Sequence, residues 1–368
     1  MGRLCWLYQV AVNQKRHYNK NLRSVCRDTN REPVKMTYLP GLAFIVIGQN
    51  EGWKLGLCLA SIFKAIRINS IKQYDVIYVD SDSQDDSLET ALSFPEVSVY
   101  KLSGVYNAAI ARNTGAEATN LSSLFFVDGD MEIEPDFLGS VIDSEGLLIY
   151  EYVSGQLKNL NYNREWERIG ESWQYSALIT SDRKMSTCGG IFLIEHSIWD
   201  TTGAMDTRFK RGQDLDFSLR LSARGKLLYR KKELIACHHT ISYTHVDRIW
   251  RTIVSGDIFY SKSLLYRVHW NNSAMYKKML QTDYSMLLLI ACLLFMCATR
   301  SVYWGVPYIA IVLSRVLKKK HQSIKDIVNN LAFVPVRDSL TLVGFIAFFP
   351  KRPSSFDYNI ELIRHVRN

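Results

Sequence analysis

Short apolar runs alternate with helix-spaced apolar residues between residues 42 and 127, and this alternation constrains the fold more than any other feature of the chain. The apolar runs that predict strands are Leu42–Ile47, Val76–Val79, Val97–Leu102 and Leu124–Val127. Between them, apolar residues recur at helical spacing from Leu55 to Ile66, and small residues fill the segment from Ala108 to Ala118. This order predicts an α/β fold with a mostly parallel sheet and helices on both faces.

The composition removes several classes of protein. The 368 residues are 47% hydrophobic and 22% charged, which excludes a disordered or collagen-like chain. The seven cysteines include no C-x-x-C pair, which argues against a disulfide framework and a zinc site and for a reducing compartment. The dinucleotide fingerprint G-x-G-x-x-G and the phosphate loop G-x-x-x-x-G-K-S/T are both absent, so neither a dehydrogenase nor a P-loop NTPase is expected.

The charge and the N-terminus bear on partners and location. The net charge of +9 suits an anionic partner such as a nucleotide, a nucleic acid or an acidic membrane surface, and charge alone does not choose among them. The first residues show no signal-peptide pattern. We therefore expect the bulk of the chain to stay in the cytoplasm.

The C-terminal part of the chain carries two apolar segments in close succession. Tyr284–Thr299 contains no charged residue, and Ser301–Ser314 contains none either. Each is shorter than the ~20 residues that span a bilayer comfortably, and lysines flank both ends of the pair. A hairpin over about 284–317 that dips into or just crosses the membrane from the cytoplasmic side is expected, with buried helices of a soluble domain as the alternative. A further apolar stretch, Ser339–Phe349, is too short to span alone and could lie in the interface.

Asp128-Gly129-Asp130 directly follows the last of the apolar runs. Because side chains alternate along an extended chain, both carboxylates are expected to point the same way, and Gly129 keeps the backbone between them approachable. Such oxygen donors suit Mg²⁺ or Mn²⁺ carrying a diphosphate, since this kind of ion takes only one or two carboxylates from the protein. A solvated acidic turn is the alternative for this tripeptide alone.

Other polar segments accompany this tripeptide in a fixed order: Asp80–Asp86, Ala111–Ala116, Gly189-Gly190 and Arg211–Leu221. As an ordered set they resemble the family 2 inverting glycosyltransferases of the GT-A fold, over roughly residues 42–245. The resemblance implies a Rossmann-like GT-A domain that moves a sugar from a nucleotide-diphosphate sugar, usually a UDP-sugar, to an acceptor.

The resemblance also implies which residues bind the donor. Asn50 and Glu51 stand in the first loop, where the family makes a backbone contact to the nucleotide. Asp80 matches the carboxylate that hydrogen-bonds the base. Arg112 and Asn113 match the A-R-N-x-G element that borders the donor pocket, where an arginine can meet phosphate.

The metal site and the base follow from the same likeness. Asp128, which also borders the donor, and Asp130 match the D-x-D element, with Asp130 the more usual direct contact to Mn²⁺ or Mg²⁺. His238 or His239 could be a further metal ligand, and only one of two adjacent residues on a strand can face the site. Asp214 matches the catalytic base that accepts a proton from the acceptor hydroxyl.

Asp214 and Asp216 compete for the role of base. Two residues apart at the start of a helix, they project about 200° from each other and cannot both face one pocket. Asp216 has Arg220 one turn along as a surface partner. Asp214 stands beside Gly212 at the helix entrance and is therefore the expected base.

Aromatic residues crowd the segment between the metal element and the base: Tyr150, Tyr152, Tyr162, Trp166, Trp173 and Tyr175. Aromatic faces stack on sugar rings, and aromatic residues also fill cores. Both uses remain open, and the acceptor cannot be named from this crowding.

Together these features predict three parts. Residues 1–38 form a basic extension, residues 39–270 a GT-A domain and residues 271–368 a C-terminal helical region with the membrane hairpin. Within the GT-A domain, residues 42–130 form the nucleotide-binding half and residues 131–245 the acceptor half.

The expected function is a metal-dependent glycosyltransferase at the cytoplasmic face of the membrane. Its partners would be a nucleotide-sugar donor, a glycan or lipid-linked acceptor and membrane lipids, with no nucleic acid, and cell-surface polysaccharide synthesis is the expected role. The alternatives are a polyprenyl-phosphate glycosyltransferase and a catalytically silent nucleotide-binding subunit of a membrane assembly.

Overall fold

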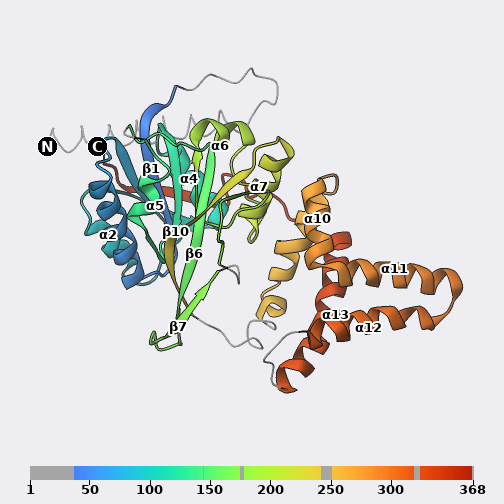
Figure 1. Ribbon diagram of the computed structural model, residues 1–368. Coiled ribbons are helices and arrows are strands. Elements are labelled where there is room, and N and C mark those ends of the chain that lie inside the picture. The colour runs from blue at the N-terminus through green and yellow to red at the C-terminus, as the bar shows by residue number, and fades with distance from the viewer. Residues whose placement is uncertain (1–36, 144, 175–177, 242–250, 319–323, 367–368) are drawn as a thin grey trace. The chain divides into compact units, whose positions relative to one another are not determined.

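The computed structural model describes residues 37–366, except 144, 175–177, 242–250 and 319–323 (Figure 1). The expected basic extension therefore lies almost wholly outside the described residues. The chain from Tyr38 onward forms one compact unit.

The secondary structure alternates between strands and helices up to β4 and becomes more varied beyond it. The strands are β1 (Leu39–Gly48), β2 (Tyr74–Asp80), β3 (Val97–Gly104), β4 (Leu121–Asp128), β5 (Met131–Ile133), β6 (Tyr152–Tyr162), β7 (Arg168–Trp173), β8 (Arg183–Met185), β9 (Phe192–Glu195), β10 (Leu228–Ile241) and β11 (Tyr358–Arg364). The helices are α2 (Trp53–Ile68), α3 (Ser87–Leu92), α4 (Ala108–Glu117), α5 (Pro135–Gly139), α6 (His196–Thr202), α7 (Gln213–Ala223), the π-helix η1 (Phe259–Ser263), α9 (Leu264–Val268), α10 (Ser273–Thr282), α11 (Tyr284–Thr299), the 3₁₀ turn η2 (Val302–Gly305), α12 (Val306–Leu317) and α13 (Ile324–Ala347).

The N-terminal half is the predicted parallel sheet. Its strands lie in the order β3-β2-β1-β4, and all three neighbouring pairs are parallel. The middle strand β1 is buried on both faces, because Phe44 packs into the core with α2 and its neighbour Ile45 packs into the core with α4. The apolar runs of the sequence are apolar for this reason, and the predicted strands and helices of this half are confirmed.

The remainder of the sheet is mixed, so the expectation of a mostly parallel sheet holds only for the first half. β4 pairs antiparallel with β9, and β9 pairs antiparallel with β6. β10 then pairs parallel with β6 and antiparallel with β5. A parallel pair requires a crossover, usually a helix, and the described residues between β6 and β9 form the strands β7 and β8 instead of a helix.

The strand register sets the position of the candidate site. Gly48 at the end of β1 pairs with Asp80 at the end of β2, and Ile47 pairs with Asp128 at the end of β4. The carboxyl ends of these three strands therefore lie at one edge of the sheet. Ligands of open α/β sheets bind at this edge.

The predicted C-terminal hairpin is formed by α11 and α12. The two helices run side by side, joined by η2, and Cys292 of α11 lies in one buried cluster with Val312 of α12 (Figure 1). The predicted stretch Ser339–Phe349 extends from within a longer helix, α13, whose residues Ile327–Ala347 are long and apolar enough to cross a membrane. The pair α10 and α11, bent by 88°, would count as a second span if it were one helix.

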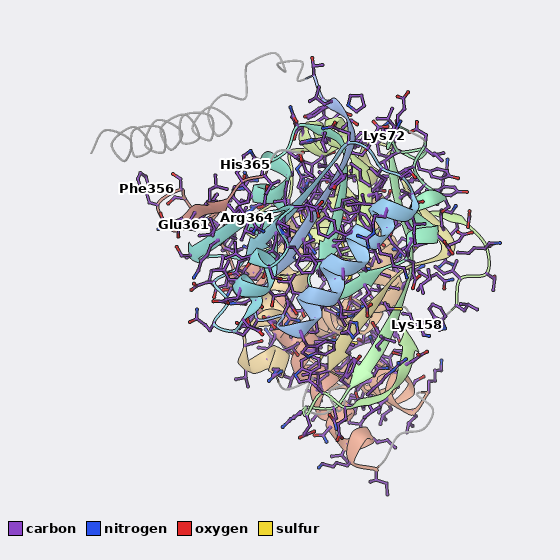
Figure 2. The ribbon with its side chains drawn as sticks, turned by 90° about the vertical axis from the view of Figure 1, so that its left-hand side faces the viewer. Lys72, Lys158, Phe356, Glu361, Arg364 and His365 are labelled. Carbon is purple, nitrogen blue, oxygen red and sulfur yellow. The ribbon has the colours of Figure 1, made fainter. Side chains whose placement is uncertain are left out.

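The end of the chain is not helical and returns to the sheet. β11 pairs antiparallel with the edge strand β3, from Tyr358 opposite Gly104 to Leu362 opposite Tyr100. Figure 2 shows Phe356, Glu361 and Arg364 of this segment at the sheet edge. The helical region expected over residues 271–368 thus ends before β11, which is a short edge strand with polar and apolar residues in alternation.

Candidate active site

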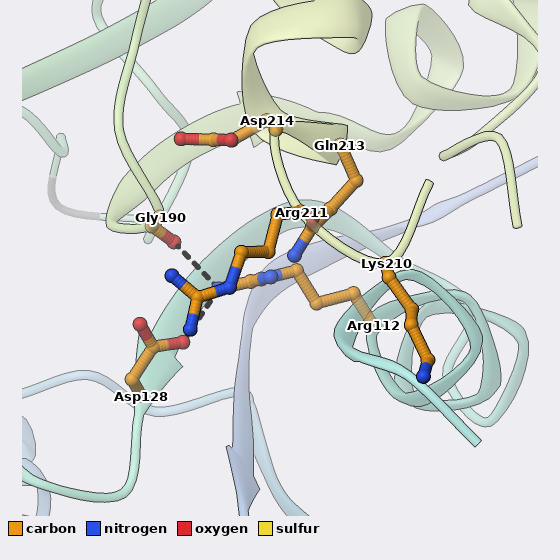
Figure 3. Close-up of a pocket in the computed structure, with 8 residues that line it drawn as sticks. Arg112, Asp128, Gly190, Lys210, Arg211, Gln213 and Asp214 are labelled. Carbon is orange, nitrogen blue, oxygen red and sulfur yellow. Dashed lines mark hydrogen bonds and ion pairs between the residues drawn. The ribbon is translucent and has the colours of Figure 1, made fainter. Parts of the chain in front are cut away.

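One pocket at the carboxyl edge of the sheet gathers residues that are far apart in the sequence. It has a volume of about 320 Å³ (Figure 3). Its lining residues are Arg112, Asp128, Gly190, Lys210, Arg211, Gly212, Gln213 and Asp214. Three cationic and two anionic side chains face one space, which suits an anionic ligand with polar groups around it.

Arg112 and Asp128 form an ion pair in the lining of the pocket. Arg112 Nη2 donates to Asp128 Oδ1 at 2.5 Å and to the carbonyl oxygen of Gly190 at 3.3 Å (Figure 3). A Cβ on Gly190 would lie 2.9 Å from Arg112 Nη2, so only glycine leaves room for this pair. Burial raises the pKa of Asp128, and the charge of Arg112 opposes that rise.

The helix that carries Arg112 approaches the sheet unusually closely. A Cβ on Gly115 of α4 would lie 2.3 Å from Ile45 Cγ2 of β1. The small residues of α4 therefore let the helix lie against the strand, and this packing brings Arg112 to the end of β4. Arg112 is 3% exposed, and its Nη2 is held by Asp128 and Gly190, whereas its buried Nε has no hydrogen-bond partner in the described part of the chain.

Asp214 lines the pocket on the side opposite Asp128 (Figure 3). It stands in the first turn of α7, two residues after Gly212, whose φ of 76° is readily adopted only by glycine. Burial raises the pKa of Asp214, and Arg112 opposes the rise. A carboxylate with a raised pKa is a better proton acceptor, which suits a general base.

Asp216 faces away from the pocket, as the helical spacing predicts. Its Oδ2 accepts from Arg220, and its Oδ1 accepts from Nε2 of His269 at 2.9 Å. The predicted pair with Arg220 is confirmed, but its expected place at the surface is wrong, because Asp216 is 0% exposed. The contact with His269 could not be predicted, because this residue is 53 positions away in the sequence.

Asp128 and Asp130 do not lie on one extended chain. The backbone turns at Gly129 and Asp130, so the alternation expected for a strand does not apply. Asp128 faces the pocket, whereas Asp130 Oδ2 accepts from Nε2 of His238 at 3.1 Å. The two carboxylates remain close enough for Asp130 to raise the pKa of Asp128 in addition to the effect of burial.

The carboxylate oxygens of Asp128 and Asp130 suit a divalent cation that also binds a diphosphate. Among the described residues, no group of three or more His, Cys, Asp or Glu side chains could hold a metal ion. Asp130 Oδ1 is buried and has no hydrogen-bond partner in the described part of the chain, which leaves it free to bind a cation. Mg²⁺ and Mn²⁺ take one or two carboxylates and draw their other ligands from phosphate and water, so Asp128 and Asp130 fit that chemistry.

The two histidines of β10 have different surroundings. Burial disfavours the charged form of His238, but the hydrogen bond and charge of Asp130 raise its pKa overall. His239 donates from Nε2 to Glu132 Oε1 at 2.6 Å, and its Nδ1 lies 2.9 Å from the hydroxyl of Tyr162. Of the two side chains, His238 contacts the Asp130 carboxylate and His239 contacts Glu132.

Glu51 reaches the same centre from the loop after β1. A Cβ on Gly129 would lie 3.1 Å from Glu51 Cγ, so the side chain lies over the D-x-D turn. Burial first, and then the charge of Asp130, raise the pKa of Glu51 to about 7, although its ion pair with Lys54 opposes the rise. Glu51 is therefore a further carboxyl group beside Asp130.

The other residues that were predicted to bind the nucleotide-sugar donor form hydrogen bonds with protein groups. Asp80 is 0% exposed, and its two oxygens accept from the hydroxyl of Tyr78 at 2.9 Å and from the amide of Ser83 at 2.8 Å. Asn50 receives a hydrogen bond from the amide of Gln84 at 2.8 Å. The two loops after β1 and β2 are thus tied together.

Asn113 supports the loop before α7. Its side-chain amide exchanges two hydrogen bonds with the backbone of Met205, at 2.9 and 3.0 Å. Sequence reasoning did not find this role, because Met205 is distant in the sequence. It also did not single out Lys210, whose only signal is that it precedes the Arg211–Leu221 segment.

The comparisons with known proteins agree with this fold. Residues 44–190 match the family described as Glycosyl transferase family 2. This match supports a family 2 glycosyltransferase domain of the GT-A fold over these residues. The match ends at Gly190, before Asp214, His238 and His239.

A comparison with solved structures gives a distant likeness. One similar structure is titled "Crystal structure of GalNAc-T7 with UDP, GalNAc and Mn2+", at 14% identity and a TM-score of 0.44. The alignment covers 59% of this chain and 45% of that one, so the chain spans less than half of the length of this structure. A search of curated proteins found no match.

Proposed function

We propose that the protein transfers a sugar from a nucleotide-diphosphate sugar, a UDP-sugar first among them, to a hydroxyl group of a glycan or glycolipid, with inversion at the anomeric carbon. The observation that carries this proposal is the pocket in which Asp214 faces Arg112 and Asp128, with the charge of Asp130 close to Asp128. A hexose is the sugar we expect, and cell-surface polysaccharide synthesis is the proposed role.

Three side chains of the pocket, and Asp130 beside Asp128, have roles in this reaction. Arg112 meets a phosphate oxygen of the donor. Asp214 accepts the proton of the acceptor hydroxyl while that oxygen forms its bond to the anomeric carbon and the diphosphate leaves. Asp128 and Asp130 would hold a Mn²⁺ or Mg²⁺ ion, which neutralises charge on the leaving diphosphate when bound.

The acidic group opposite Arg112 supports a hydroxyl acceptor over a lipid phosphate. A phosphate acceptor is already ionised and needs no base, whereas a hydroxyl acceptor does. Asp214 is buried and lines the pocket, which would repel a phosphate placed next to it. A polyprenyl-phosphate acceptor is therefore the less favoured function.

We further propose that the enzyme acts at the cytoplasmic face of a membrane. The apolar helices α11, α12 and α13 support this location, together with the lysines that flank the hairpin. Exposed apolar side chains on these helices include Leu294, Phe295 and Ile309. Such a surface is normally covered by lipid or by another protein.

Turnover of nucleotide sugars by the purified full-length protein tests this function. Release of UDP from a panel of UDP-sugars is measured with Mn²⁺, with Mg²⁺ and with a chelator, and thermal shifts report which nucleotide diphosphate binds. We expect metal-dependent release with at least one donor. A nucleotide-induced shift without release from any donor would contradict the proposal and favour a silent nucleotide-binding subunit.

A further inference from the structure

We propose that four rings beside the metal-binding carboxylates, those of Trp53, Tyr162, Trp166 and His239, form a subsite that stacks on a sugar ring of the acceptor. We call this set the aromatic corner. The inference rests on the proposed function, and it adds that the acceptor is a saccharide recognised through the apolar face of its ring.

The rings of the aromatic corner meet edge to face. The indole planes of Trp53 and Trp166 lie at 89° to each other with centroids 5.7 Å apart. Trp53 also meets Tyr162 at 69° and 5.9 Å, and His239 at 79° and 5.2 Å. Two indoles at right angles present two walls, and a pyranose ring can stack on one wall while its edge contacts the other.

Both indoles are open to solvent although they touch each other. Trp53 is 45% exposed and Trp166 is 37% exposed. The other two rings, Tyr162 and His239, are buried behind them at 9% and 4%. Two buried rings therefore support two indoles that solvent can reach. This arrangement is typical of a binding site rather than of a core.

The turn between β6 and β7 holds Trp166 in a strained backbone conformation. Its φ is 62°, in the left-handed region that a bulky residue rarely adopts. The side chain of Asn163 fixes this turn, because its Oδ1 accepts from the amides of Glu165 at 3.0 Å and Glu167 at 2.8 Å. Strain that is maintained by its surroundings is a feature of functional sites, and here it directs one exposed indole toward another.

The aromatic corner adjoins the metal-binding centre through short connections. The amide of His239 donates to the carbonyl oxygen of Asp130 at 2.9 Å. Trp53 follows two residues after Glu51, which lies over the turn between Asp128 and Asp130. A ligand on the corner is therefore next to the turn that carries Asp128 and Asp130.

Polar groups at the corner suit the hydroxyl groups of a sugar. The ammonium group of Lys54 lies 4.9 Å from the centroid of the Trp166 ring. Glu132, which accepts from His239, is 37% exposed at its side chain and provides an acceptor. Carbohydrate C–H groups carry partial positive charge and are attracted to the negative faces of aromatic rings, while hydroxyl groups need donors and acceptors at the rim.

Fluorescence of the full-length protein tests the inference. Tryptophan emission is titrated with cellotriose, laminaritriose, chitotriose and maltotriose, in the wild type, in Trp166→Gly and in Trp53→Phe. Glycine accepts the left-handed backbone at position 166, so this variant removes the ring without endangering the turn. We expect at least one trisaccharide to bind, Trp166→Gly to weaken its affinity by about tenfold, and Trp53→Phe to retain most of it.

Matched measurements separate this inference from the proposed function. Trp270→Phe removes an exposed indole elsewhere and should leave trisaccharide affinity unchanged. Hydrolysis of the donor without acceptor should persist in Trp166→Gly, because the donor pocket does not include that ring. If the wild type does not hydrolyse the donor, this result overturns the proposed function and leaves the sugar subsite untouched.

Two results would overturn the aromatic corner as a sugar subsite. The first is that no trisaccharide binds the wild type, or that the affinity is the same in Trp166→Gly. The second is that Trp166→Gly retains trisaccharide affinity but loses binding to vesicles of phosphatidylcholine and phosphatidylglycerol, which would make the exposed indoles a contact to the membrane.

Discussion

Arg112 holds Asp128, and His238 holds Asp130, so each carboxylate of the D-x-D turn has its own basic neighbour. Asp214 and Glu51 add two more carboxyl groups around the same centre, and burial raises the pKa of both. Such a concentration of acidic groups is unfavourable by itself and becomes favourable when a cation is present. The single side chains thus lead to predictions about the base and the metal.

The first prediction concerns the base. Asp214→Asn should lower turnover by about 10²-fold or more, since it removes the proton acceptor, while the affinity for the nucleotide diphosphate is retained. The melting temperature should not fall, because burial disfavours the charge that the substitution removes. Steady-state kinetics and nucleotide titration check both statements, and near wild-type turnover would remove Asp214 from the reaction.

The second prediction concerns the metal. Asp130→Ala should abolish the Mn²⁺-dependent part of nucleotide binding and nearly all turnover, because the loss of charge neutralisation costs several kcal/mol in the transition state. Asp82→Ala is the matched control, since Asp82 pairs with Lys101 at 3.3 Å at the surface and lies outside the pocket. Titrations with and without Mn²⁺ measure the effect. Equal metal dependence of the two variants would refute the assignment.

Sequence patterns identified the acidic residues at the strand ends but not their partners. Asp128 and Asp130 could be found because they follow an apolar run, and Asp214 because its segment resembles the one that carries the family's base. The burial of Asp80 and the bonds of Asn113 could not, since they depend on Tyr78 facing the same way and on Met205 arriving from a distant loop. A side chain's availability to a ligand depends on these contacts.

At the scale of elements, α7 is attached to the C-terminal helices by one buried carboxylate. Asp216 of α7 accepts from Arg220 on its own helix and from His269 directly after α9. The side chain of Asn272 adds a hydrogen bond to the carbonyl oxygen of Leu219 at 2.9 Å. The helix that presents Asp214 is thus fixed from its rear face.

The third prediction follows from this attachment. Asp216→Asn should destabilise the protein by about 3 kcal/mol, because it breaks a buried ion pair and leaves Arg220 without its charged partner. Nucleotide affinity at low temperature should be retained, since Asp216 does not line the pocket. Thermal unfolding of Asp216→Asn beside Asp214→Asn measures the difference. A melting temperature equal to that of the wild type would show that the buried pair contributes nothing to stability.

The elements of the first half could be predicted because their strands are buried on both faces and hence apolar throughout. The second half could not be predicted in the same way, since β7 is almost wholly exposed and β11 lies at an edge. An exposed strand need not be apolar, so its sequence resembles that of a loop. The alternation of Tyr358, Ile360 and Leu362 was the available signal for β11.

The whole molecule combines an α/β domain with C-terminal helices that expose apolar side chains. The fourth prediction is that the full-length protein sediments with membranes and is released by detergent but not by high salt, because apolar contacts are insensitive to ionic strength. Ile309→Asp, on the exposed side of α12, should weaken this association. Phe356→Asp, at an exposed residue outside the helices, is the control. Complete recovery of the wild type in the supernatant without detergent would contradict the location.

The pairing of β11 with β3 means that the apolar helices are an insertion with two covalent connections to the catalytic sheet. A region joined by one linker can swivel in any direction, whereas a region joined at two separate points turns only about the line between them. Arg364 strengthens the second connection, because it donates to the carbonyl oxygens of Ala91, Leu92 and Val97. A truncation that removes the apolar helices together with the C-terminus therefore also removes a strand of the catalytic sheet and leaves the edge of β3 open to other chains.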